Sequence, residues 1–94
     1  MRIEWSDNKN RVNQKKHGVS FELAQEVFND LLALSRHDRI EGGEERWHTI
    51  GMAEGVILIV AHTFSGRGDE EVIRVISARK ATKHEQRFYE EGQD

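Results

Sequence analysis

The sequence contains no cysteine and no proline in its 94 residues. The absence of cysteine excludes a disulfide scaffold, a zinc site with thiolate ligands and catalysis by a thiol, and it is typical of a reducing compartment. There is also no run of about 18 apolar residues and no apolar N-terminal segment, so we expect neither a membrane helix nor a secretion signal. These absences predict a cytoplasmic protein without a membrane partner.

The length allows one domain, residues 1–94, with one hydrophobic core. The composition is 36% hydrophobic and 33% charged, which is typical of a globular domain. The net charge is −3, but the charges are segregated. Residues 9–17 and 74–87 together hold 9 of the 14 cations and only 1 of the 17 acids, and these nine are Lys9, Arg11, Lys15, Lys16, Arg74, Arg79, Lys80, Lys83 and Arg87. If the two segments meet in space, they form a positive side; otherwise they are solvated helix faces.

Capping residues and apolar spacing predict three helices. The first begins at Ser6 or Asp7 and ends at His17 before Gly18, and the second begins at Ser20 and carries an apolar stripe as far as Leu32. The third runs from Thr82 to Glu91, with a capping-box spacing at its start. Only the second helix has the stripe of a core helix.

Alternating apolar residues predict strands at 2–5, 32–39, 45–53, 56–64 and 71–79. Short links bearing glycine favour an antiparallel meander of the last four, and the run VILIVA at 56–61 is typical of a central strand. The predicted fold class is α+β: two N-terminal helices packed on a four-stranded antiparallel sheet, with the first strand at its edge and a C-terminal helix.

Strict alternation on the last strand places Arg74 and Arg79 on opposite faces. Arg74 has apolar neighbours on its own face, so it either reaches a cleft or forms an ion pair, for example with Glu45 or Glu54. Arg46 and Trp47 also point to opposite faces, Trp47 toward the core and Arg46 toward water or a ligand.

His62 follows the apolar run, where it either exchanges a proton near neutral pH or caps the core. The five histidines have no i, i+4 pair and no cysteine companion, so we expect no metal site. Residues 66–68, Gly-Arg-Gly, lack the Lys-Ser/Thr of a phosphate loop and are interpreted as a turn, and no serine lies in a nucleophile-elbow pattern. No cofactor is expected.

The remaining inventory of Arg, Lys, His and Glu suits the cleavage of RNA. The 2′-hydroxyl of RNA attacks the neighbouring phosphate once it is deprotonated, and the phosphorane charge needs cationic stabilisation. Arginine suits the phosphorane, while His or Glu can act as the base.

Three strings resemble the BrnT family, the toxin ribonucleases of bacterial type II toxin-antitoxin pairs. They are WSDNKNRVNQKKHGVSFELAQEVF at 5–28, EERWHTIG at 44–51 and RVISARKATKHEQRFYEE at 74–91. The resemblance implies a RelE-like fold and metal-independent RNA cleavage that halts translation. It also implies a cognate BrnA-like antitoxin of the ribbon-helix-helix type, through which the complex would repress its own promoter DNA.

The resemblance implies roles for particular residues. Arg46 and Arg79 would stabilise the phosphate, and His62 or Glu45 would transfer the proton. The residues expected to position RNA are Lys9, Lys16, His17, Arg74, Lys80, Lys83 and Arg87. An alternative remains open, in which the chain is a module without catalysis that binds its antitoxin or RNA and acts as a co-repressor.

Overall fold

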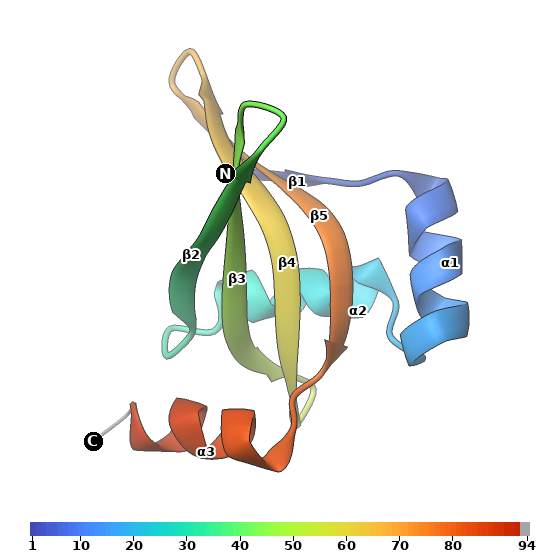
Figure 1. The fold of residues 1–94 in the computed structure, drawn as a ribbon, viewed down its shortest axis with the longest axis vertical. Helices are drawn as coiled ribbons and strands as arrows, with labels where there is room; N and C mark the ends of the chain where they lie inside the picture. The colour runs from blue at the N-terminus through green and yellow to red at the C-terminus, as the bar shows by residue number, and fades with distance from the viewer. Residues whose placement is uncertain (93–94) are drawn as a thin grey trace.

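The computed structural model describes residues 1–92, which form one five-stranded sheet with helical segments around it (Figure 1). The order of the strands in the sheet is β1-β5-β4-β3-β2. The elements are β1 (Arg2–Glu4), α1 (Asp7–His17), α2 (Phe21–Ala24), the 3₁₀ helix η1 (Gln25–Asn29), β2 (Leu34–Glu41), β3 (Glu44–Ala53), β4 (Val56–Arg67), β5 (Glu70–Lys80) and α3 (Lys83–Glu91).

The four long strands form the predicted antiparallel meander, with β4 at the centre of the sheet. β1 lies at the edge as expected, and it pairs with β5 in parallel, so the sheet has five strands rather than four. The α+β class is therefore confirmed, while the predicted strand number is wrong. No helix among residues 1–92 is long and apolar enough to cross a membrane.

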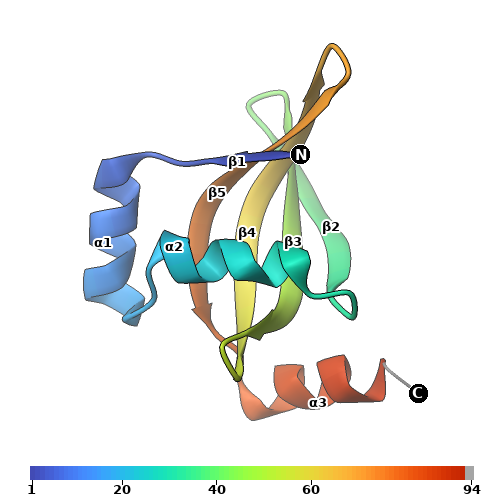
Figure 2. The same cartoon turned by 180° about the vertical axis from the view of Figure 1, so that it is seen from behind.

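One face of the sheet, here named the covered face, is packed under α2 and η1 (Figure 2). Phe21, Val27, Leu58 and Val60 are fully buried there. The two layers approach closely at Gly51, where an added Cβ would lie 2.7 Å from Val27 Cγ1. Only glycine fits at this point without a shift of the helical segment.

α1 does not pack on a face of the sheet, which corrects the expected RelE-like pair of helices on the sheet. It stands beside the edge of β5, as Figures 1 and 2 both show. Its buried residues are Asn10 and Asn13, and the Asn13 side chain donates to Ala78 O at 2.8 Å and accepts from Ala78 N at 3.1 Å. Asn13 thus satisfies the edge of β5 as a neighbouring strand would, because its amide offers the same donor and acceptor as a peptide group.

The predicted second helix ends earlier than Leu32. Regular α-helix gives way to η1 at Gln25, and the chain leaves the helical conformation at Asp30, whose carboxylate accepts from Leu32 N at 3.0 Å. Such a bond from an Asp side chain to the backbone two residues later competes with helix continuation. Leu31, expected in the apolar stripe, is 99% exposed.

β5 contains one extra residue opposite β4, and this changes the predicted faces. Ala61 pairs with Ser77, but His62 pairs with Val75, so Ile76 is unpaired at a β-bulge. A bulge reverses the alternation of side chains beyond it. Arg74 and Arg79 therefore lie on the same face, opposite to the covered face, and not on different faces as strict alternation predicted.

α3 crosses the lower end of that other face (Figure 1) and begins with the predicted capping box. Thr82 Oγ1 accepts from Glu85 N at 3.2 Å, and the Glu85 carboxylate accepts from Thr82 N at 2.8 Å. Tyr89 packs with Ile50 and Ile59 in a second, smaller core beneath the helix. The rest of this face carries no helix, and we name it the open face.

We predict that Asn13→Ala lowers the free energy of unfolding by about 2–4 kcal/mol, because it leaves buried backbone groups of Ala78 and Val19 without partners. Urea denaturation measures the change. The exposed Asn8 on the same helix provides the matched control, since Asn8→Ala should cost less than about 0.5 kcal/mol. Equal effects of the two substitutions would contradict the edge-pairing role of Asn13.

Candidate functional site

The open face collects arginines from three strands, β2, β3 and β5, into one surface. The strand pairing places these side chains in cross-strand rows: Arg39, Arg46, Thr63 and Arg74 form one row, His48, Ala61 and Ser77 the next, and Ile50, Ile59 and Arg79 the third. Arg36 lies opposite His48 on the edge strand. Ala61 and Ser77 give the middle row two small side chains.

Carboxylates neutralise three of these arginines. Arg74 Nη2 lies 2.6 Å from Glu44 Oε1, so the alternative of an ion pair is correct for Arg74, although its partner is neither Glu45 nor Glu54. Arg39 contacts both Asp38 and Glu41. Arg79 donates from Nη1 and Nη2 to the two oxygens of Glu85, at 2.8 and 2.9 Å.

The Arg79 fork has a marked effect on Glu85. The hydrogen bonds from Arg79, together with the backbone donor at Thr82, lower the pKa of Glu85 to about 2. Glu85 is therefore ionised at any physiological pH, and it serves as a fixed anchor for the guanidinium rather than as a proton carrier.

Arg36 and Arg46 differ from the other three, because no carboxylate among the described residues lies within salt-bridge distance of either. The Nε of Arg46 is buried and has no hydrogen-bond partner within residues 1–92. Arg46 also lies directly opposite Arg39 across the strand pair, an arrangement of like charges that weakens a sheet. Among residues 1–92, the charges of Arg36 and Arg46 are therefore not balanced by a neighbouring carboxylate.

A hollow of about 330 Å³ lies between α3 and the open face. Leu34, Ile50 and Ile59 contribute its apolar lining, and Phe88 of α3 also lines it. The polar lining consists of Ser35, Arg36, His48, His84 and Glu85. His48 Nε2 is 3.7 Å from Asp38 Oδ2, so a carboxylate stands beside one of the two imidazoles.

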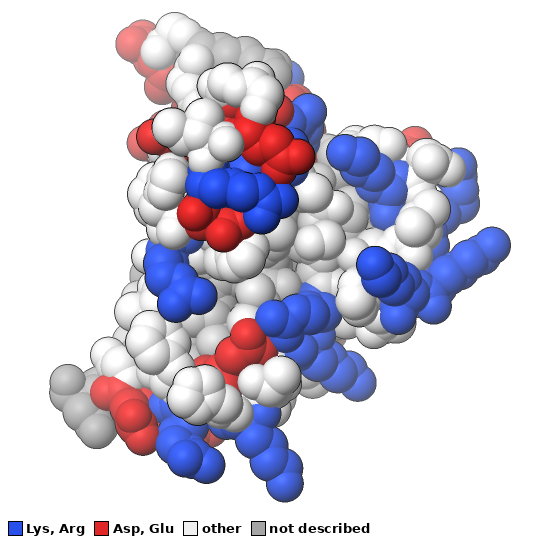
Figure 3. All heavy atoms as spheres, in the orientation of Figure 1, with Lys and Arg blue, Asp and Glu red and all other residues white. Residues whose placement is uncertain are grey.

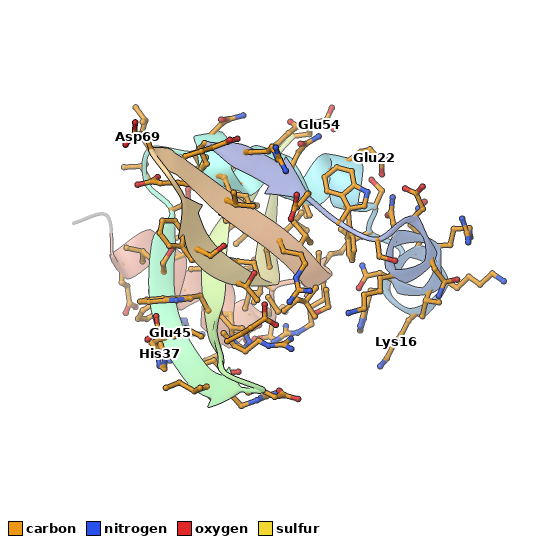
Figure 4. All side chains as sticks on the ribbon, turned by 90° about the horizontal axis from the view of Figure 1, so that it is seen from above. Lys16, Glu22, His37, Glu45, Glu54 and Asp69 are labelled. Atoms are coloured by element: carbon orange, nitrogen blue, oxygen red, sulfur yellow. The ribbon has the colours of Figure 1, made fainter. Side chains whose placement is uncertain are left out.

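The two cationic segments of the sequence meet at the edge of this face. A second, shallower hollow is lined by Lys9, Lys16 and His17 of α1 and by Ser77 of β5. In Figure 4 Lys16 extends away from Glu22 and Glu54, which lie on the side of α2. Figure 3 shows blue side chains over α1, the lower sheet and α3, with several red ones among them.

The structure brings together only part of the predicted catalytic set. Arg46 and Arg79 share the open face, whereas His62 and Glu45 belong to the other face by their pairing with Trp47 and Ile40. Glu45 is exposed at 57% of its side chain and lies 3.8 Å from His37 (Figure 4). Trp47, expected in the core, is half-buried and packs edge-on against His37.

His62 is a core residue in this fold. It is 3% exposed and lies edge-on against Phe28 of η1. Its Nε2 is 2.7 Å from Thr49 Oγ1, and its Nδ1 is 3.0 Å from the carbonyl oxygen of Thr63. Burial lowers the pKa of His62, so the ring stays neutral with both nitrogens satisfied. The alternative that His62 caps the core fits this position.

The residues predicted to hold RNA occupy four places. Lys9, Lys16 and His17 line the hollow beside α1, and Arg74 is on the open face. Lys83 and Arg87 lie exposed on α3, four residues apart. Lys80 is exposed, but it pairs opposite Leu58 and so belongs to the covered side.

Sequence reasoning missed Arg36, His48 and His84. His48 follows Arg46 by two residues in the same strand, so alternation could have placed both on one face. Arg36 and His84 carried no such signal, because their position depends on the pairing of β2 and on where α3 crosses the sheet.

A known protein family matches most of this chain. Residues 5–85 match the family model described as ribonuclease toxin, BrnT, of type II toxin-antitoxin system. The chain belongs to the BrnT family. A comparison with curated proteins gives no match. As a BrnT toxin the chain has an RNA target and an antitoxin partner. No group of three His, Asp or Glu side chains in the described part of the chain is arranged to hold a metal ion.

We predict that acid destabilises this BrnT protein through His62. The pKa of His62 is lowered in the fold, so below about pH 6.5 the unfolded chain binds a proton that the folded chain resists, and the free energy of unfolding falls. Urea denaturation at pH 7.5 and pH 5.5 measures the loss. In His62→Gln the loss between the two pH values should be smaller, and an unchanged loss would show that another group is responsible.

Proposed function

We propose that this BrnT protein cleaves single-stranded RNA on its open face by attack of a 2′-hydroxyl on the adjacent phosphate. The oxygen–phosphorus bond that forms closes a 2′,3′-cyclic phosphate, and the bond to the 5′-oxygen breaks. The observation that carries the proposal is the gathering of five arginines and an imidazole on one uncovered sheet face. The reaction requires only a proton acceptor, a proton donor and positive charge at the phosphorane.

Arg36 and Arg46 are the proposed phosphate ligands. Both guanidinium groups lack a carboxylate partner among the described residues, so a phosphate would meet no competing carboxylate at either. Arg79 is held by Glu85 and presents its remaining N–H groups in a fixed orientation. A guanidinium positioned before the reaction stabilises developing charge at little cost in reorganisation.

His48 and His84 are the proposed proton carriers, because both line the hollow between α3 and the sheet. One imidazole takes the proton from the 2′-hydroxyl, and the other gives a proton to the 5′-oxygen. Asp38 beside His48 favours one orientation of that ring, which suits His48 as the acceptor. His62 and Glu45 would then have no part in proton transfer.

The flanking RNA would follow the cations of α1 and α3. Lys9, Lys16 and His17 adjoin Ser77 at one side of the face, and Lys83 and Arg87 adjoin its lower end. The proposed partner is a BrnA-like antitoxin of the ribbon-helix-helix type that covers the open face, and the complex would reach promoter DNA through the antitoxin. The family's membership of type II systems supports a partner of this kind.

We predict that Arg46→Ala lowers the rate of RNA cleavage by about 10²- to 10³-fold, the usual loss when one preorganised donor is removed. His48→Gln should lower it by about 10²- to 10⁴-fold. The rates are measured on a synthetic RNA in the presence of EDTA, with product analysis for the cyclic phosphate.

Arg11→Ala is the matched control, because Arg11 is exposed on α1 and lies outside both hollows. Cleavage by the control should remain within about 2-fold of wild type, the range expected for an exposed charge far from the reaction. Loss of activity in EDTA for the wild type would overturn the metal-independent chemistry. RNA binding without any cleavage would favour the module without catalysis.

A further prediction concerns salt. RNA that contacts several cations releases counterions, so the logarithm of the binding constant should fall with the logarithm of salt concentration by about 0.7 for each neutralised phosphate. Lys9→Gln with Lys16→Gln should reduce the slope by about 1, while Lys15→Gln, which lies outside the hollow, should leave it unchanged. Fluorescence anisotropy between low and moderate salt measures the slopes, and a flat response of the wild type would contradict an RNA path over α1.

A further inference from the structure

The hollow between α3 and the open face has a partly apolar lining, which suits a ligand that has an apolar part as well as a phosphate. Three aliphatic side chains, Leu34, Ile50 and Ile59, line it together with Phe88. Phe88 is 55% exposed and belongs to neither core cluster of the fold. An exposed aromatic ring beside an apolar surface favours a ligand with a flat apolar face.

Polar groups line the same hollow, and they indicate that the ligand also carries hydrogen-bonding groups. Arg36, His48 and His84 line it and offer hydrogen-bonding nitrogens. A nucleobase has this combination, since its two faces are apolar and its edge carries hydrogen-bonding groups. RNA-binding proteins commonly stack an unpaired base on an aromatic side chain or a guanidinium plane while reading its edge.

We propose that this hollow is a nucleobase subsite, in which Phe88 stacks on one unpaired base of the bound RNA; this inference rests on the proposed RNA cleavage at the same face. The base enters between α3 and β3, and its phosphate then lies toward the arginines of the open face. Phe88 is thereby a positioning residue that fixes the RNA backbone relative to His48.

Charge favours RNA over a protein segment as the occupant of the subsite. Arg36 lines the hollow without a carboxylate partner among the described residues, and Lys83 and Arg87 lie on the helix that forms one wall. Among residues 1–92, Glu85 is the only carboxylate that lines the hollow, and the Arg79 fork already binds it. An apolar ligand attached to a polyanion matches these surroundings.

The test compares two short oligomers of equal length and charge: a 2′-fluoro RNA, which lacks the attacking hydroxyl, and a fully abasic phosphodiester chain. We expect the wild-type protein to bind the base-bearing oligomer about 5- to 100-fold more tightly, as a stacked base contributes in other proteins. Phe88→Ala should remove most of this preference. The matched control is Phe64→Ala, since Phe64 is 45% exposed and lies on β4 near the distant hairpin.

Cleavage of natural RNA provides a second readout. Phe88→Ala should raise KM and lower kcat, whereas Phe64→Ala should change neither. Equal base preference in both variants would overturn the subsite, even if the wild type cleaves RNA as proposed. A variant that loses binding to the antitoxin but keeps the base preference would show that the hollow receives protein instead. If the wild type neither binds nor cleaves RNA, the proposed function fails together with the subsite.

Discussion

The extra residue in β5 at Ile76 is the constraint on which the candidate site depends. Without it, Arg74 and Arg79 would lie on opposite faces of the sheet. The bulge also places Ala78 where Asn13 of α1 can pair with both of its backbone groups. One local irregularity thus orders the arginines on the open face and fixes the cationic helix beside them.

A second anchor holds the opposite end of the site. The Tyr89 hydroxyl donates to Asp30 Oδ2 at 2.6 Å, and the same oxygen accepts from Met52 N at 2.8 Å. The contact with Asp30 raises the pKa of Tyr89 to about 12, so the phenol remains a donor across the physiological range. α3 is tied in this way to the loop that follows η1, and the hollow beneath Phe88 keeps its shape because both of its walls are fixed.

The sequence predicted the elements that depend on local pattern and missed those that depend on pairing. The capping box at Thr82, the left-handed Gly18 after α1 and the central position of β4 follow from short stretches and are confirmed. The bulge at Ile76 leaves no mark in the alternation of β5, because the residues on both sides of it are apolar or small. His62 was ambiguous for a related reason, since the chain alone does not show which face of β4 the helical layer covers.

In the proposed RNA cleavage, how strongly each arginine can bind phosphate depends on whether a carboxylate already contacts it. Glu85 belongs to the capping box of α3 and also binds Arg79, so it occupies two of the five N–H donors of that guanidinium. A phosphate that approaches Arg79 meets a guanidinium whose charge is already balanced by an ionised carboxylate. Arg36 and Arg46 have no such competitor among the described residues, so an incoming phosphate gains more from them. The proposed phosphate ligands are therefore Arg36 and Arg46, the two arginines of this face that have no carboxylate partner among the described residues.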